Sequence, residues 1–103
     1  MKRIILLAFL CTTTLVMAQR INHVQEAIAN YDYEAALTLI AKEKPTIPLL
    51  LQKGKAQRGL GMNTEALSTY QEIITNDTAN TRAYIEAAEC CHSLAKYQQA
   101  LKY

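Results

Sequence analysis

The clearest structural signal is in residues 47–75, which read IPLLLQKGKAQRGLGMNTEALSTYQEIIT. Residues suited to packing recur there at spacings of three and four, which places them on one face of a helix. They are Leu50, Gly54, Gln57 and Leu60. Gly61 then interrupts the pattern, and glycine is typical of a helix end. The stretch therefore predicts two helices, over residues 47–60 and 63–75, joined by a turn at Gly61.

Part of this pattern occurs three times in the chain, aligned on an Ala-Leu pair. The pairs are Ala36-Leu37, Ala66-Leu67 and Ala100-Leu101. The first two alanines are 30 residues apart and the last two 34, so the first unit is shortened by four residues around Pro45 to Pro48. Residues are lost at least cost from a loop. Repetition at this period predicts stacked helix hairpins, and no segment predicts a strand.

Residue sizes in the units resemble those of the tetratricopeptide repeat family, and the chain looks like an exported bacterial member. The middle unit has its small residue, turn glycine, alanine and aromatic residue at Gly54, Gly61, Ala66 and Tyr70. The last unit matches at Tyr84, Ala88 and Ala100, with Asn80 as the helix cap and a turn at Ala95-Lys96-Tyr97. The leading unit matches at Asp32, Tyr33, Ala36 and Leu37, whereas Arg20 and Val24 replace the expected large and small residues.

The resemblance implies an all-α fold, namely a right-handed superhelical array of antiparallel helix hairpins, an α-solenoid of about two and a half repeats. The repeats cover residues 19–45, 47–80 and, incompletely, 81–103. Small residues are expected to let helices approach closely, while large ones fill the space between hairpins. The small set is Gly54, Ala66, Ala88 and Ala100, and the large set is Leu50, Leu67, Tyr70, Ile73 and Tyr84. A second packing stripe is predicted at Tyr84, Ala87, Ala88, Cys91 and Leu94.

The pattern lacks the proline expected at Thr78, and no capping helix follows the last unit. Because a repeat buries its apolar face only against a neighbour, we expect the chain to be the N-terminal piece of a longer array. A partner that covers the open end is the alternative, and self-association through this uncapped end is a further expectation.

Residues 1–18 have the order of a secretory signal peptide. Its parts are the positive Lys2 and Arg3, the apolar run from Ile4 to Leu10, and the small side chains at Val16 and Ala18. The apolar run is too short for a comfortable membrane span, so we expect cleavage after Ala18 rather than a retained anchor. Lipidation at Cys11 is disfavoured because bulky Leu10 precedes it. The mature protein is therefore expected to be periplasmic or secreted, without a stable membrane span.

Charge and composition limit the classes of partner. The chain has 11 basic and 9 acidic residues, and loss of Lys2 and Arg3 with the signal leaves it formally neutral. No basic stripe occurs elsewhere, which argues against nucleic acid as a partner. Glycine and proline are scarce, which argues against disorder and against an all-β fold.

The sequence contains no catalytic or metal-binding constellation. His23 and His92 are far apart, and Glu89 three positions before His92 is expected to form a surface hydrogen bond rather than half a metal site. Cys90 and Cys91 point about 100° apart on a helix, so we expect free thiols that pack as small apolar residues rather than a redox site. Phosphate-binding loops and nucleophile motifs are missing. We therefore expect no enzymatic activity, no cofactor and no metal.

Residues 76–79 read NDTA and carry one modification signal. Asn76-Asp77-Thr78 has the spacing of an N-glycosylation acceptor, and Asp77-Thr78-Ala79 resembles an O-glycosylation motif of exported bacterial proteins. Capping of the next helix by Asp77 or Asn80 explains the same polar residues and is preferred, with glycosylation of Asn76 or Thr78 left open.

In the family that the chain resembles, the first helix of each hairpin lines a concave groove that meets the partner. The corresponding residues are Ile21, Gln25 and Ile28 in the leading unit, Leu51, Gln52, Lys55 and Arg58 in the middle unit, and Arg82, Ile85, Glu89 and His92 in the last. Lys55 and Arg58 share a helical face, so they are expected to reach an acidic side chain or a peptide carboxylate, or else to form a solvated surface. The Lys-Asn-Arg clamp of chaperone-binding members is not predicted, because the asparagines are lacking.

The leading hypothesis is a non-enzymatic scaffold of the cell envelope that binds a protein partner, as a peptide or a subunit, in this groove. One alternative is the N-terminal sensor or interaction region of a larger membrane-bound signalling protein. Another is an accessory module of an enzyme whose chemistry is encoded beyond Tyr103.

Overall fold

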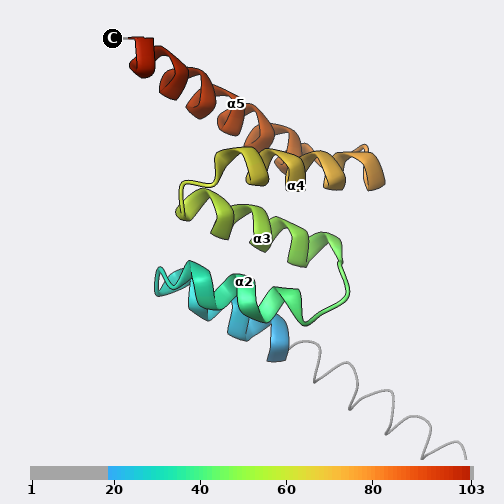
Figure 1. Cartoon of the computed structure of the whole chain (residues 1–103). Coiled ribbons are helices and arrows are strands. Elements are labelled where there is room, and N and C mark those ends of the chain that lie inside the picture. The colour runs from blue at the N-terminus through green and yellow to red at the C-terminus, as the bar shows by residue number, and fades with distance from the viewer. Residues whose placement is uncertain (1–18, 103) are drawn as a thin grey trace, which may run out of the picture.

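The computed structural model describes residues 19–102, except for the side chains of residues 97 and 99–102, and every regular element in this range is a helix (Figure 1). Residues 19–29 are helical, and α2 (Tyr33–Ala41), α3 (Ile47–Gly59), α4 (Asn63–Asn76) and α5 (Thr81–Lys102) follow. Each helix packs against the next one along the chain. The predicted all-helical fold is confirmed, and α3 and α4 end within one residue of their predicted limits. The predicted signal peptide, residues 1–18, lies outside the described residues.

The first hairpin (residues 19–41) and the second hairpin (residues 47–76) turn in the same way. The matching hydrogen bonds run from Asp32 N to the Ala27 carbonyl and from Met62 N to the Gln57 carbonyl, each 2.8 Å long. Both turns hold one residue in the left-handed region, Tyr31 at φ 59° and Gly61 at φ 76°. Glycine adopts this conformation freely, whereas tyrosine has a steric penalty. The 30-residue repeat found in the sequence is therefore also a repeat of backbone structure.

Polar side chains begin three of the helices. The capping bonds are Ala35 N to Asp32 Oδ1 (3.2 Å), Leu49 N to Thr46 Oγ1 (3.4 Å) and Ala83 N to Asn80 Oδ1 (3.0 Å). Each satisfies a backbone amide that has no partner inside its helix. The prediction that Asn80 caps the helix after it is confirmed, and Asp77 accepts a hydrogen bond from Asn80 Nδ2 at 3.2 Å.

Two apolar cores lie on opposite sides of α3. The core on the first hairpin's side consists of Val24, Ile28, Ala36, Ile40, Leu49 and Ala56. The core toward α4 and α5 consists of Leu50, Ala66, Tyr70, Ile73, Ala83 and Cys90. A Cβ atom on Gly54 would lie 2.5 Å from the Tyr70 ring, so the ring packs on α3 only because residue 54 has no side chain. The packing roles predicted for Gly54 and Ala66 are thus confirmed.

The last helix differs from the prediction. α5 is one continuous helix of 22 residues, so the turn predicted at Ala95-Lys96-Tyr97 is wrong. Neither glycine nor proline occurs there to end the helix, and alanine and lysine favour its continuation. Within residues 19–102 the second helix predicted for the last hairpin does not form, so no helix after α5 packs back against it. This explains why Tyr84, Ala88 and Cys91 of the predicted stripe are exposed. Tyr84 and Ala88 therefore do not take the packing roles expected of them, and the predicted role of Ala100 lies outside the described side chains.

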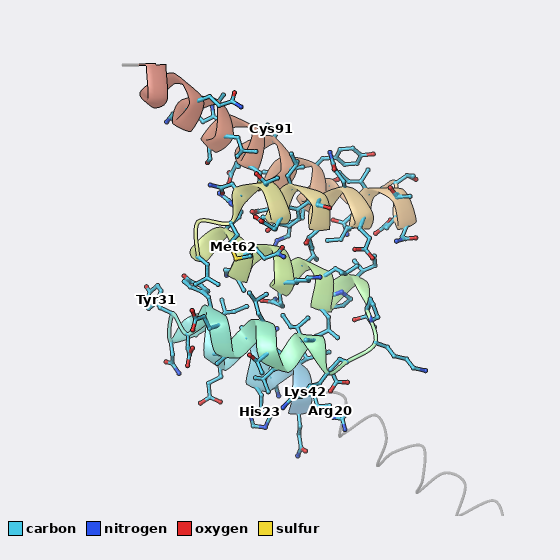
Figure 2. All side chains as sticks on the ribbon, in the orientation of Figure 1. Arg20, His23, Tyr31, Lys42, Met62 and Cys91 are labelled. Carbon is cyan, nitrogen blue, oxygen red and sulfur yellow. The ribbon has the colours of Figure 1, made fainter. Side chains whose placement is uncertain are left out.

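The two neighbouring cysteines have different surroundings. Both are free thiols, as predicted. Cys90 is buried in the core shared by α4 and α5, where burial raises the pKa of its thiol. Cys91 is exposed on α5 (Figure 2), so the packing interpretation is confirmed for Cys90 and wrong for Cys91. No helix within residues 19–102 is both long and apolar enough to cross a membrane.

Candidate binding groove

A cavity of about 480 Å³ brings together side chains from the two hairpins and from α5. It is lined by Gln25, Ile28, Ala29, Tyr31, Tyr33, Gln52, Lys55 and Arg82. Five of these, Gln25, Ile28, Gln52, Lys55 and Arg82, were among the groove residues expected from the sequence, and they come from three different helices. Their meeting shows that the first helices of successive units line one hollow.

A smaller hollow of about 200 Å³ continues this cavity. Lys55 and Arg82 line both, and the second hollow adds Leu51, Arg58, Tyr70 and Glu86. The two hollows therefore form a single polar groove that crosses residues 19–29, α3 and α5. We call this surface the α3–α5 groove.

Among the predicted groove cations, Arg58 is the one whose charge is already compensated by residues in 19–102. Its Nη1 forms ion pairs with Glu86 and with Glu89, the latter at 2.9 Å. Burial alone would lower the pKa of Arg58, but the hydrogen bonds and charges of the two glutamates outweigh this effect and raise it. Arg58 thus ties α3 to α5 and shapes the groove, and its expected availability to a partner carboxylate is reduced.

The other two cations of the groove have no such partner within residues 19–102. Lys55 and Arg82 are both exposed, and neither takes part in an ion pair with a described residue. Positive charge in a partly enclosed hollow attracts carboxylates, and an arginine can hold one through two parallel hydrogen bonds. The groove is therefore chemically suited to an acidic group.

Two tyrosines at the groove were not expected from the sequence. Tyr31 is 79 % exposed and stands out from the first turn (Figure 2), with its ring edge-on to that of Tyr33 at a centroid distance of 6.3 Å. A Cβ atom on Gly59 would lie 2.4 Å from the Tyr33 ring, so this glycine gives the ring its place. One signal in the sequence could have indicated Tyr31. It is a large residue at the turn position where the second hairpin has Gly61.

The remaining predicted groove residues lie apart from the cavity. Ile85 and His92 are exposed on α5, and Glu89 reaches the groove only through its ion pair with Arg58. The hydrogen bond expected between Glu89 and His92 is therefore replaced by a contact with α3. Ile21 packs against the first core. Ile28 does line the cavity, although most of its side chain is buried in that core.

Within residues 19–102 no group of three His, Cys, Asp or Glu side chains is arranged so that it could hold a metal ion. Comparisons of the chain with protein-family models, with curated proteins and with solved structures find no match. The case for the α3–α5 groove as a functional site accordingly rests on its geometry and charge.

Proposed function

We propose that this protein is a non-enzymatic interaction module that binds an acidic segment of another protein in the α3–α5 groove. We also propose that its hairpins belong to a superhelical array of the tetratricopeptide type. The shared turn geometry of the first two hairpins and the Gly54–Tyr70 packing support this assignment.

The observation that carries the proposal is the meeting of Gln25, Gln52, Lys55 and Arg82 in one hollow. Side chains from three helices converge there, and a short peptide laid across them would contact all three. The two glutamines offer amides that both donate and accept hydrogen bonds, which suits a peptide backbone. Lys55 and Arg82 would meet an aspartate, a glutamate or a C-terminal carboxylate.

Tyr31 gives this groove an aromatic contact. Its left-handed backbone conformation is unfavourable for tyrosine and is typical of positions where local strain serves a site. A large exposed ring beside two cations is the kind of residue that dominates binding at protein interfaces. The preferred segment therefore has an apolar side chain next to its acidic one.

The setting that we propose is the cell envelope. The order of charge, apolar run and small residues in residues 1–18 supports export to the periplasm or outside the cell. A scaffold there would hold a partner peptide or a neighbouring subunit in place without changing it chemically.

The proposal is tested with a random hexapeptide library displayed on beads and the labelled protein. Peptides that contain Asp or Glu beside an apolar residue should be enriched, and binding should weaken with salt. The double variant Lys55→Met/Arg82→Met should reduce affinity for the enriched peptides about three- to tenfold. Lys96→Met, an exposed α5 residue outside the groove, is the matched control. Equal enrichment of basic and acidic peptides would refute the proposal, as would a double variant that binds like the control.

A further inference from the structure

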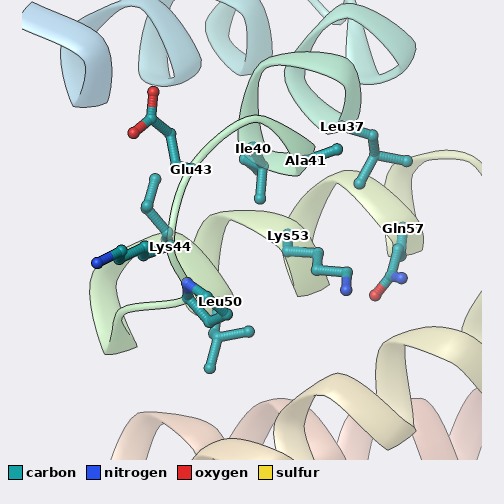
Figure 3. Close-up of a pocket in the computed structure, with 10 residues that line it drawn as sticks. Leu37, Ile40, Ala41, Glu43, Lys44, Leu50, Lys53 and Gln57 are labelled. Atoms are coloured by element: carbon teal, nitrogen blue, oxygen red, sulfur yellow. The ribbon is translucent and has the colours of Figure 1, made fainter.

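A second cavity, of about 400 Å³, lies between α2 and α3 and is distinct from the α3–α5 groove (Figure 3). Its lining comes from the end of α2, the connection that follows it, and one face of α3. It shares no residue with the cavity that contains Lys55 and Arg82. A volume of this size is within the range of small-molecule sites.

The cavity exists where the first hairpin is short. α2 has 9 residues, whereas α4, its counterpart in the second hairpin, has 14. Beyond Ala41 the chain leaves the helix and crosses to α3 through residues 42–46, with Pro45 in the cavity wall. The four-residue shortening was expected in the loop, but the structure places it in α2, which is more than one turn shorter than α4. The cavity lies beside α3 at the point where α2 has ended.

The floor of the cavity is apolar. Leu37 and Ile40 of α2 line it together with Leu49 and Leu50 of α3. Ile40, Leu49 and Leu50 each belong to one of the two cores and are at least nine-tenths buried, so the floor is rigid. Such a surface gains free energy when an apolar group displaces water from it.

One end of the cavity carries a cation and an amide one helical turn apart. Lys53 and Gln57 are four residues apart on α3, so their side chains lie on one face of the helix. Gln57 is 7 % exposed, and its Oε1 accepts a hydrogen bond from Thr69 Oγ1 at 2.7 Å. Its Nε2 makes no hydrogen bond to any residue in 19–102, and no side-chain nitrogen or oxygen in this range is both buried and unpaired, so this donor is open to solvent at the cavity wall.

The charge of the cavity is positive. Lys44 and Lys53 both line it and take part in no ion pair with the residues described. Glu43 is the one acidic residue of the lining, and its two oxygens lie 3.0 Å from Arg20 Nη1. Figure 3 shows its carboxylate directed toward the first helix, so Arg20 compensates this charge and leaves the two lysines in excess.

We infer that this cavity binds a small carboxylic acid with an apolar body. The carboxylate lies between the Lys53 ammonium and the Gln57 amide, and the apolar body lies on the leucine and isoleucine floor. Lys44 adds to the positive potential from the connection. The inference is independent of the peptide-binding proposal, because it concerns a different surface.

The test uses sodium octanoate with the isotope-labelled protein, followed by amide chemical shifts. Octanoate should cause saturable shifts in residues 37–57, with a dissociation constant of about 1 mM or below, as expected for a ligand of this size. Butanoate should bind about tenfold more weakly or worse, because it leaves most of the floor uncovered. Octylammonium, with the same chain and the opposite charge, should not bind. Equal binding of octanoate and octylammonium would overturn the inference, as would the absence of saturable shifts at about 20 mM octanoate, well above that constant.

Two lysine variants locate the head group. Lys53→Met keeps the aliphatic stem, removes the charge, and should weaken octanoate binding about five- to tenfold. Lys42→Met removes one positive charge from an exposed neighbouring position outside the cavity and should leave the affinity unchanged. Each variant is first compared with the parent by amide shifts, so a folding defect is separated from a binding defect. If Lys53→Met and Lys42→Met bind octanoate equally, the assigned site is wrong.

Discussion

The first and second hairpins share the backbone geometry of their turns and have different interiors. In the second, Gly54 makes room for the ring of Tyr70, and Gln57 accepts a hydrogen bond from Thr69. Thirty residues earlier, the corresponding positions of the first hairpin hold Val24 with Ile40 and Ala27 with Leu39. The pair of a very small and a very large residue, Gly54 with Tyr70, thus takes the place of two residues of intermediate size in the first hairpin. The fold constrains the sum of the two sizes at each contact rather than either residue.

The turns of the two hairpins also have the same backbone conformation but different residues. Gly61 fits its left-handed conformation, whereas Tyr31 adopts it against its own preference. The ring of Tyr31 lines the groove, whereas Gly61 has no side chain. Of the two turns, the one whose residue fits the left-handed conformation poorly is therefore the one that lines the groove.

The largest expected effect comes from breaking the size match in the second hairpin. Gly54→Val places a branched side chain into the Tyr70 ring and should lower the free energy of unfolding by about 3 kcal/mol, measured by urea denaturation. Adding Tyr70→Ile, which copies the Val24–Ile40 pair, should recover more than half of the loss. If the double variant loses as much free energy of unfolding as the two single variants together, the residue pairs of the two hairpins are not interchangeable.

The second expected effect is loss of stability at alkaline pH through Tyr70. Burial, together with the charge of Glu86, raises the pKa of Tyr70 to about 12 from its ordinary value of 10.0. Below pH 10 the hydroxyl is protonated in both the folded and the unfolded chain, so this contribution is constant. Between pH 10 and 12 only the unfolded chain loses the proton, so stability should fall by about 1 kcal/mol per pH unit.

Tyr70→Phe is the control for this pH dependence. The first hairpin has apolar Ile40 at the corresponding position, and the phenylalanine variant makes the second hairpin equally unable to titrate there. Its stability, followed by urea denaturation across the same range, should decline less steeply. Parallel declines for the two proteins would show that the Tyr70 hydroxyl is not the group responsible.

The smallest effect is expected from exchanging the turn residues. Gly61→Tyr should destabilise the protein by about 1 kcal/mol, because the left-handed conformation is unfavourable for a residue with a Cβ atom. Tyr31→Gly should stabilise it by somewhat less, about 0.5 kcal/mol, because glycine also gains entropy in the unfolded chain. Thermal unfolding monitored by circular dichroism measures both. A destabilising Tyr31→Gly would mean that packing of the ring on Tyr33 outweighs the backbone strain.

The features that sequence predicted well are those set by neighbouring residues. The ends of α3 and α4, the turn at Gly61 and the cap at Asn80 depend on residues within about one helical turn, and their signals are local. Gly54 and Tyr70 were each predicted to pack, but the contact between them was not predicted. The turn expected at residues 95–97 failed because it was carried over from the repeat rather than supported by a helix-ending residue.

The candidate sites depended on contacts that no local pattern encodes. Five residues of the larger groove cavity were predicted, because the family resemblance assigns the groove to the first helix of each hairpin. The pairing of Arg58 with Glu86 was not predicted, because it joins positions 28 residues apart. The cavity beside α2 was missed, although the four-residue shortening of the first unit was evident. A deletion in the sequence does not indicate whether the hollow it leaves is filled by the loop.

Burial on both sides of α3 has a consequence for how the protein comes apart. Leu49 and Ala56 belong to the first core, and Leu50 to the second. In a linear stack of helices the outer helices can unfold one at a time. Unfolding of α3, in contrast, would disrupt both cores at once, because both pack against it. This one helix therefore joins two separate hydrophobic clusters into a single cooperative unit.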